Sequence, residues 1–392
     1  MATIRAHINP EMLTWARTRA RFDLDSASAR VGVKPERYAA WEEGTKKPTL
    51  KQLRKIGKVF GRPPALFYLD SPPDEPEILK EMRRLPSVAD GPESPALALQ
   101  VRLAVERRDV ALSLHEQLGE HPREIGLTLS LSDDPERAAS AVRDVLGVGV
   151  GEQMIWSERG AALRNWRLAF ERAGVLVFQV PGVPMKEMRG FAIAERPLPV
   201  IAYNSKDSDA GRIFTLFHEF GHVLLGSTSL DTQSSLVSGD HWQVERFCNH
   251  LAAASLVPQS ELIKSASGHG PNGLWSEGEV LRLARRFGVS ASVLVRRLDR
   301  FGLIASGVYD ALREHFDHFT PSASGDDAEG GNVYRNRIVH VGRYLTELAF
   351  RSYAEDRMTA TDLSALVNLQ VKLLDSLADK MAEGGSATRV GA

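Results

Sequence analysis

Apolar residues follow two different periodicities along this chain, and the changes between them predict its elements. Up to residue 70 they recur three or four positions apart, as in Leu53, Ile56 and Phe60, which is the spacing of one buried helix face. Short β-rich runs follow much later, over 175–180, 190–194 and 199–203. Helical spacing then returns and continues to about residue 384. These patterns predict an α+β fold that is mostly helical, with one small sheet.

The first 70 residues are predicted to form four short helices joined by tight turns. Asn9, followed by proline, can cap the first helix, and Asp25 can cap the second. Pro35 opens the third, and Thr49 caps a fourth that ends at Gly61. Short helices with glycine turns are typical of a helix-turn-helix DNA-binding domain.

Charge sets this segment apart from the rest of the chain. The whole protein has a formal net charge of −1, which names no partner. Up to Asp70, however, fourteen lysines and arginines face seven acidic residues. A basic unit in a nearly neutral chain is suited to contact with phosphates.

Composition and spacing also predict the domain boundaries. We expect a helix-turn-helix domain over 1–70, a proline-rich linker over 71–95, a mixed domain over 96–265, a helix-turn-helix-like extension over 266–319, a flexible loop over 320–332, and a helical region with a loose tail over 333–392. A single cysteine, Cys248, excludes a disulfide framework and favours a reducing compartment. We see no signal peptide and no long uncharged apolar run, so a cytoplasmic protein is expected.

The most informative motif is His218-Glu219-x-x-His222, on a helix predicted over 209–225. Residues four apart on a helix project from one face, so the two imidazoles can hold one Zn²⁺ ion. Glu219 can then reach a water molecule at the ion and take its proton. The rest of the helix is almost wholly apolar, so these polar groups are buried and need a partner, which a metal would supply.

A zinc hydrolase needs a third protein ligand. The next helix, over 241–256, offers Glu245, and Asn249 one turn further on could orient that carboxylate. Cys248 could also bind a metal but is expected to pack beside the motif helix. His241 and His250 are alternatives as ligand or as oxyanion stabiliser, although His250 falls on a different helix face from Glu245.

Together these stretches resemble the ImmA/IrrE metallopeptidase family. The resemblance rests on residues 212–225, on Glu245-x-x-Cys-Asn249 with Ala252 and Pro258, on the preceding strand pair, and on residues 284–304. It implies a zincin-like metallopeptidase domain over 96–265 in which His218, His222 and Glu245 bind zinc and Glu219 is the general base. It also implies a protease of the kind that cleaves a helix-turn-helix repressor. For the oxyanion, Tyr203, Arg212 and His241 are candidates.

Residues 33–48, with Trp-Glu-x-Gly followed by a proline, resemble the Xre/Cro-type repressor signature. The resemblance implies that Lys34, Glu36, Arg37 and Tyr38 face a DNA groove and that Lys46 and Lys47 hold phosphates. The second helix begins Leu24-Asp-Ser-Ala27, where such domains often carry glutamine, which puts base-specific readout in doubt. The alternative is a helix-turn-helix domain that contacts proteins.

Three hypotheses follow from these motifs. The first is a zinc endopeptidase fused to a DNA-binding domain, which cleaves a transcriptional repressor in a stress or mobile-element response. The second is a transcriptional regulator whose metallopeptidase-like domain senses a metal or ligand without cutting anything. The third is an antitoxin-like partner of a toxin. The intact Glu219 favours the first hypothesis, because a sensor has no need of a base. A homodimer through the C-terminal helices is possible in each case.

Overall fold

A computed structural model describes residues 4–73, 94–156, 158, 160–231, 240–269, 273–318 and 333–386. The chain divides into two compact units, Met1–Val105 and Glu106–Ala392. The division falls inside helix α7 (Pro95–Leu118). The domain limits expected from the sequence remain predictions, since the expected loop over 320–332 and most of the expected linker lie outside the described residues.

The first unit is built from short helices whose ends are set by capping. It contains α1 (Pro10–Arg19), α2 (Leu24–Val31), α3 (Pro35–Glu42), α4 (Leu50–Phe60) and the 3-10 turn η1 (Pro64–Tyr68). Asn9 caps α1, and Thr49 forms a capping box with Gln52 at the start of α4. The cap of α2 is Asp23 rather than Asp25, because Asp23 is the residue whose side chain accepts the N–H of Ser26.

One helix face from each of α1 to α4 forms the core of this unit. Tyr38 and Trp41 of α3 lie against each other with ring centroids 5.7 Å apart, and Ile56 and Phe60 come from α4. Leu50, at the first position of α4, lies outside this core and is 36% exposed. A two-pronged ion pair joins Arg17 of α1 to Glu42 of α3, with Nε to Oε1 at 2.8 Å and Nη2 to Oε2 at 3.0 Å.

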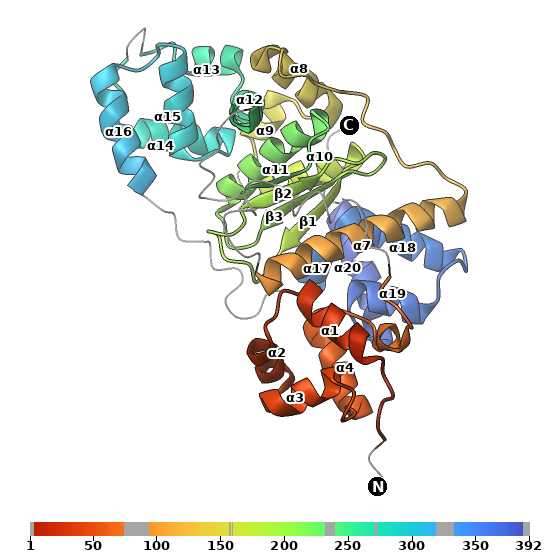
Figure 1. Ribbon diagram of the computed structural model, residues 1–392. Coiled ribbons are helices and arrows are strands. Elements are labelled where there is room, and N and C mark those ends of the chain that lie inside the picture. Colours follow the sequence, from red (N-terminus) through yellow and green to blue (C-terminus); the bar gives the residue numbers. More distant parts are fainter. Residues whose placement is uncertain are drawn as a thin grey trace. The chain divides into compact units, whose positions relative to one another are not determined.

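The second unit holds the sheet and the remaining helices (Figure 1). Before and around the sheet come α8 (Pro135–Leu146), α9 (Val150–Met154), α10 (Ala161–Arg172), β1 (Leu176–Val180), β2 (Gly190–Ile193), β3 (Val200–Asn204), α11 (Asp209–Leu224) and β4 (Ser229–Asp231). They are followed by α12 (Asp240–Leu256), α13 (Gln259–Ser265), α14 (Glu277–Phe287), α15 (Ala291–Arg300), α16 (Ser306–His318), α17 (Val333–Val341), α18 (Arg343–Ala354), α19 (Ala360–Val367), η2 (Val371–Leu373) and α20 (Leu374–Ser386).

The four strands lie in the order β1-β3-β2-β4. β1 runs parallel to β3, while β2 is antiparallel to both β3 and β4. In the register, Gly190 of β2 faces Tyr203 of β3 and Asp231 of β4, and Ala192 faces Ser229. The sequence predicted β1 to β3 and the α+β class, but β4 was missed because three residues are too few to show a strand pattern.

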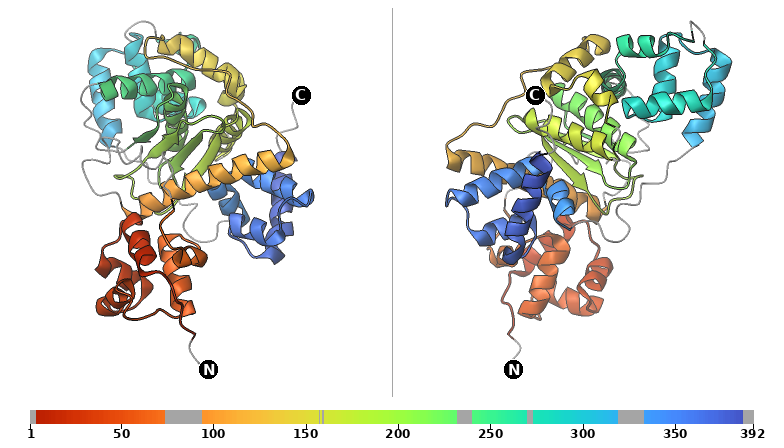
Figure 2. Two further views of the ribbon diagram at one scale, coloured as in Figure 1. Left: turned by 45° about the vertical axis from the view of Figure 1, so that its right-hand side comes forward. Right: turned by 180° about the vertical axis from the view of Figure 1, so that it is seen from behind.

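Both faces of the sheet are covered by helices (Figure 2). Val177 points into a core shared with α10 and α11, including Phe170 and Phe217. Its neighbour Phe178 points the other way, under the guanidinium of Arg107 from α7 and against Gly342 between α17 and α18. Every residue of β1 and β3 is buried, which explains their continuous apolar runs. Among the described residues, no helix is long and apolar enough to cross a membrane.

A buried carboxylate attaches the C-terminal helices to this core. Glu171, near the end of α10, accepts the backbone N–H groups of Arg343 and Tyr344 at 2.8 and 3.2 Å. These are the first residues of α18, whose cap position is Gly342 and therefore supplies no side chain. Glu171 thus caps a helix from another element. Burial raises the pKa of Glu171 to about 7, although Arg167 opposes the shift.

We predict that Glu171→Gln changes how stability depends on pH. The folded pKa of Glu171 lies above the ordinary value, so its contribution to stability is largest in acid and falls as pH rises from about 4.5 to about 7. The variant keeps the accepting oxygen but cannot ionise, and should lack this fall, which amounts to up to about 3 kcal/mol. Urea unfolding at several pH values, followed by circular dichroism, measures the difference. Parallel profiles for the two proteins would contradict the assignment.

Candidate metal centre

Helix α11 carries the two histidines of the motif into the core. Its first turn is capped by Ser208, whose hydroxyl accepts the N–H of Gly211 at 3.1 Å. Beyond that turn the helix packs under the sheet, so that His218 is 3% exposed, His222 1% and Glu219 not at all. Three polar side chains are thereby held inside an apolar core, where each needs a compensating contact.

Helix α12 lies against α11 because a glycine lets the two backbones approach. A Cβ at Gly221 would lie 3.0 Å from the sulfur of Cys248 and 3.3 Å from its Cα. Cys248 is fully buried in this contact, and burial raises the pKa of its thiol well above the ordinary range. Gly221 stands next to His222, and Cys248 stands one turn after Glu245. The close contact therefore places Glu245 opposite the two histidines.

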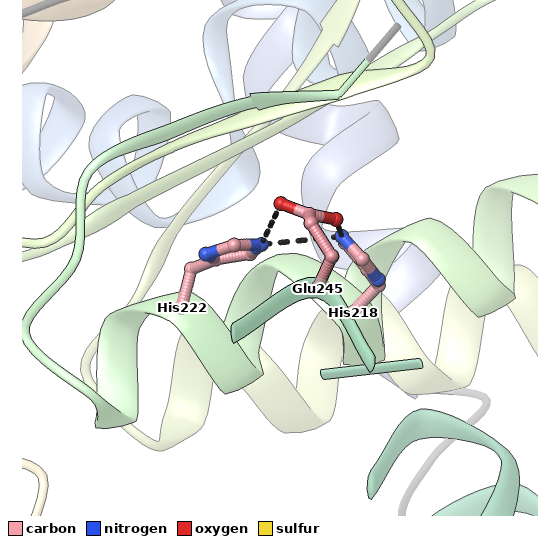
Figure 3. A group of neighbouring side chains, drawn as sticks. All are labelled: His218, His222 and Glu245. Atoms are coloured by element: carbon pink, nitrogen blue, oxygen red, sulfur yellow. Dashed lines mark hydrogen bonds and ion pairs between the residues drawn. The ribbon is translucent and has the colours of Figure 1, made fainter. Parts of the chain in front are cut away.

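His218, His222 and Glu245 converge on one point (Figure 3). The two Nε2 atoms are 3.2 Å apart, and the carboxylate oxygens of Glu245 lie 3.3 Å from Nε2 of His218 and 3.2 Å from Nε2 of His222. Two ligands in a tetrahedral zinc site, each about 2.0–2.1 Å from the ion, are separated by about 3.3 Å. The three donors therefore fit one tetrahedral ion, and their chemistry, two imidazoles and a carboxylate, suits zinc.

Electrostatics favour an ionised Glu245. Burial by itself would raise the pKa of this carboxyl group, but hydrogen bonds from the two imidazoles outweigh burial and hold the pKa well below its usual range. Its side chain keeps 20% exposure, whereas the histidines are closed off. The site is thus open on the Glu245 side. A catalytic metal site needs such access for water and substrate.

Two strands of the sheet contact the side chain of Glu219. Its Oε2 accepts a hydrogen bond from Ser229 of β4 at 2.5 Å. Its Oε1 lies beside Gly190 of β2, where a Cβ would come within 2.9 Å. No motif in the sequence singled out Ser229. The one available signal was a serine shortly after the motif helix, and that signal is too common to be useful.

The remaining predicted site residues lie elsewhere. Asn249 is exposed, and the described contacts include no hydrogen bond between it and Glu245. Tyr203 is fully buried and its hydroxyl donates to Gln179 at 3.3 Å, so it is not open to an oxyanion. Arg212 donates to the carbonyl of Ser205, and its Nη1 lies 3.7 Å from Oδ1 of Asp209. These two contacts stabilise the start of α11.

The two alternative ligand candidates, His241 and His250, lie in different settings. His241 belongs to the first turn of α12, and its side chain lies outside the part of the chain that the structure describes. His250 binds Glu136 of α8 at 2.8 Å, on another side of α12. Glu136 also accepts hydrogen bonds from both terminal nitrogens of the buried Arg297 of α15. His250 therefore belongs to a hydrogen-bonded cluster with Glu136 and Arg297 and not to the metal centre.

The predicted DNA-binding residues divide into exposed and buried ones. Lys34, Glu36 and Arg37 are exposed on and before α3, as are Lys46 and Lys47 in the following turn. Lys47 also contacts Nδ1 of His7 at 2.7 Å. Tyr38 was wrongly expected to face DNA. It is fully buried, because it lies one turn before Trp41 and shares its inward face.

Comparisons with known proteins agree with both parts of this description. Residues 170–299, which contain the three converging side chains, match the peptidase M78 family model described as the IrrE N-terminal-like domain. Residues 15–67 match the helix-turn-helix family model. The chain is also 32% identical over 77 residues to the cryptic phage CTXphi transcriptional repressor RstR of Vibrio cholerae, which covers 20% of this chain and 69% of the repressor.

Fold and site thus define a helix-turn-helix protein joined to a peptidase-like domain with a possible metal centre. Residues 170–299 form an IrrE-like domain of the peptidase M78 family, and an Xre/Cro-type helix-turn-helix domain precedes it. That domain supports DNA binding, and the combination is that of a regulator.

We predict that Glu245→Ala weakens zinc binding by more than about 100-fold, since loss of an outer partner alone costs 10–100-fold. Competition with a chromophoric chelator measures the affinity. Asn249→Ala is the matched control, because it changes an exposed residue one turn further along α12. Equal zinc affinity in the Glu245 variant and the wild type would remove this residue from the ligand set.

Proposed function

We propose that the protein is a zinc-dependent endopeptidase fused to a DNA-binding domain. It cleaves a helix-turn-helix transcriptional repressor and so switches on a stress or mobile-element response. One observation carries the proposal. His218, His222 and Glu245 have the mutual distances of three zinc ligands, and Glu219 is buried beside them. A purely structural zinc site would be closed by four protein ligands.

The chain's own residues divide the work of peptide hydrolysis. When bound, the ion supplies Lewis acidity to the scissile carbonyl and to the attacking water. Glu219 takes the proton of that water and returns it to the leaving amine. β4 is the last strand of the described sheet next to β2, and an edge strand can hold an extended peptide by backbone hydrogen bonds. No side chain is assigned to the oxyanion.

A repressor is the substrate we favour because of the domain that precedes the peptidase. The first unit matches a helix-turn-helix model, and the similar phage protein is a transcriptional repressor. A domain of this type can bring the peptidase to the DNA site at which a repressor is bound. It can also pair with the corresponding domain of the repressor itself.

The zinc-loaded protein is predicted to cut the helix-turn-helix repressor encoded beside its own gene, whereas Glu219→Gln is not. Glutamine cannot accept the proton of the attacking water, so kcat should fall by at least about 100-fold. Mass spectrometry of the products gives the cleavage site.

Zinc content and promoter binding should be equal in the two proteins, which serves as the internal control. If neither protein cuts the repressor while both bind zinc and promoter DNA, the sensor hypothesis replaces the protease. If the neighbouring gene encodes a toxin and the intact protein neutralises it, the antitoxin hypothesis does.

DNA binding is predicted to depend on the exposed side of α3. Lys34→Ala and Arg37→Ala should each weaken promoter binding and reduce the salt slope by about one unit if the side chain contacts a phosphate. Lys58→Ala removes the same charge from the exposed side of α4 and is the control. Fluorescence anisotropy at several salt concentrations measures the slope. Equal losses in all three variants would show that only the net charge matters.

A further inference from the structure

The general base of the proposed reaction, Glu219, must be oriented by groups other than the metal ligands. Glu219 follows His218 by one residue, so its side chain leaves α11 about 100° away from its neighbour. The carboxylate is fully buried, and several side-chain torsions must be fixed before one oxygen can meet a water molecule. Groups outside α11 must therefore orient it.

Ser229 provides the first of these groups. Its hydroxyl donates to Oε2 of Glu219 across 2.5 Å, and the serine itself is only 3% exposed. A hydroxyl that donates to one carboxylate oxygen leaves the other oxygen able to accept a proton. The contact therefore selects which oxygen of Glu219 serves as the base.

Strand β2 provides the second. Gly190 has no side chain, and a Cβ there would lie 2.9 Å from Oε1 of Glu219 and 2.3 Å from Cγ2 of Thr215. Gly190 and Ala192 alternate onto the same face of β2, and Ala192 pairs with Ser229. Residues on one face of the sheet thus leave space for the carboxylate and also donate a hydrogen bond to it.

We propose that Ser229 is a positioning residue for Glu219, and that strand β4 belongs to the catalytic machinery through this contact. The inference rests on the proposed function, because it assigns Glu219 as the base. β4 follows α11 after a short turn at Gly226. The segment that leaves the ligand helix therefore returns to fix the base that the same helix carries.

A neighbouring hydroxyl allows this role to be separated from general support of the strand. The hydroxyl of Thr228 accepts the N–H of Ala194 at 3.4 Å, just beyond β2. It therefore supports the backbone at the same end of the strand pair. Removing it takes away one hydroxyl beside the strand pair and leaves the donor to Glu219 in place.

The first test compares Ser229→Ala, Ser229→Thr and Thr228→Val in repressor cleavage. In Ser229→Ala, kcat should fall about 10- to 100-fold, the usual effect of losing an orienting partner, with KM and zinc content unchanged. Ser229→Thr keeps a hydroxyl and should recover most of kcat. Thr228→Val should match the wild type. In a Glu219→Gln background, Ser229→Ala should have no further effect, because there is no base left to position.

The second test needs no substrate. Acetohydroxamate binds zinc and gives up its proton to a nearby base, so its affinity for the zinc-loaded protein reports where Glu219 points. Ser229→Ala should bind it about tenfold more weakly. Thr228→Val should bind it like the wild type, and Glu219→Gln should be weakened with no added effect of Ser229→Ala.

The outcomes separate this inference from the function on which it rests. If the wild type cuts the repressor and binds the probe, and Ser229→Ala does both equally well, only the positioning role is wrong. Loss of zinc or of folded structure in Ser229→Ala, with Ser229→Thr equally impaired, would also overturn it. If the wild type binds neither zinc nor acetohydroxamate, the proposed function fails and this inference fails with it.

Discussion

The contact between Gly221 of α11 and Cys248 of α12 is the constraint on which the metal centre depends. Because no side chain separates the two helices there, Glu245 reaches the imidazoles of His218 and His222. Without this approach, the imidazoles of His218 and His222 would be buried without the carboxylate that now accepts their hydrogen bonds. The helix pair and the site are therefore one arrangement.

The sheet completes that arrangement from the other side. Strands β2 and β4 both contact the carboxylate of Glu219. Gly190 of β2 leaves space for it, and the hydroxyl of Ser229 in β4 donates a hydrogen bond to it. The three converging side chains are thus placed by helix packing, and Glu219 by strand pairing. Burial of Glu171 under α18 extends the same core to the C-terminal helices, so one unit joins the centre to a region outside the matched family model.

Local rules accounted for most of the helices, the three longer strands and the three ligand candidates. The caps at Asn9 and Thr49 lie at the ends where their side chains predicted them. The errors arose where several local solutions compete. Asp23 and Asp25 are both able to cap α2, and only the backbone path selects the first. Tyr38 has a polar end that suggested DNA, but its position one turn before Trp41 turns it inward.

The sequence by itself determined the chemistry: two histidines at helical spacing, a glutamate between them, and a basic helical domain in front. Only the tertiary structure decided which further residues join them. It places Glu245 beside the two histidines and pairs His250 with Glu136. It also buries Tyr203 and places the hydroxyl of Ser229 against the carboxylate of Glu219. The reason is physical. Spacing along one helix is fixed by its 3.6-residue turn, whereas contacts between elements depend on how closely their backbones approach.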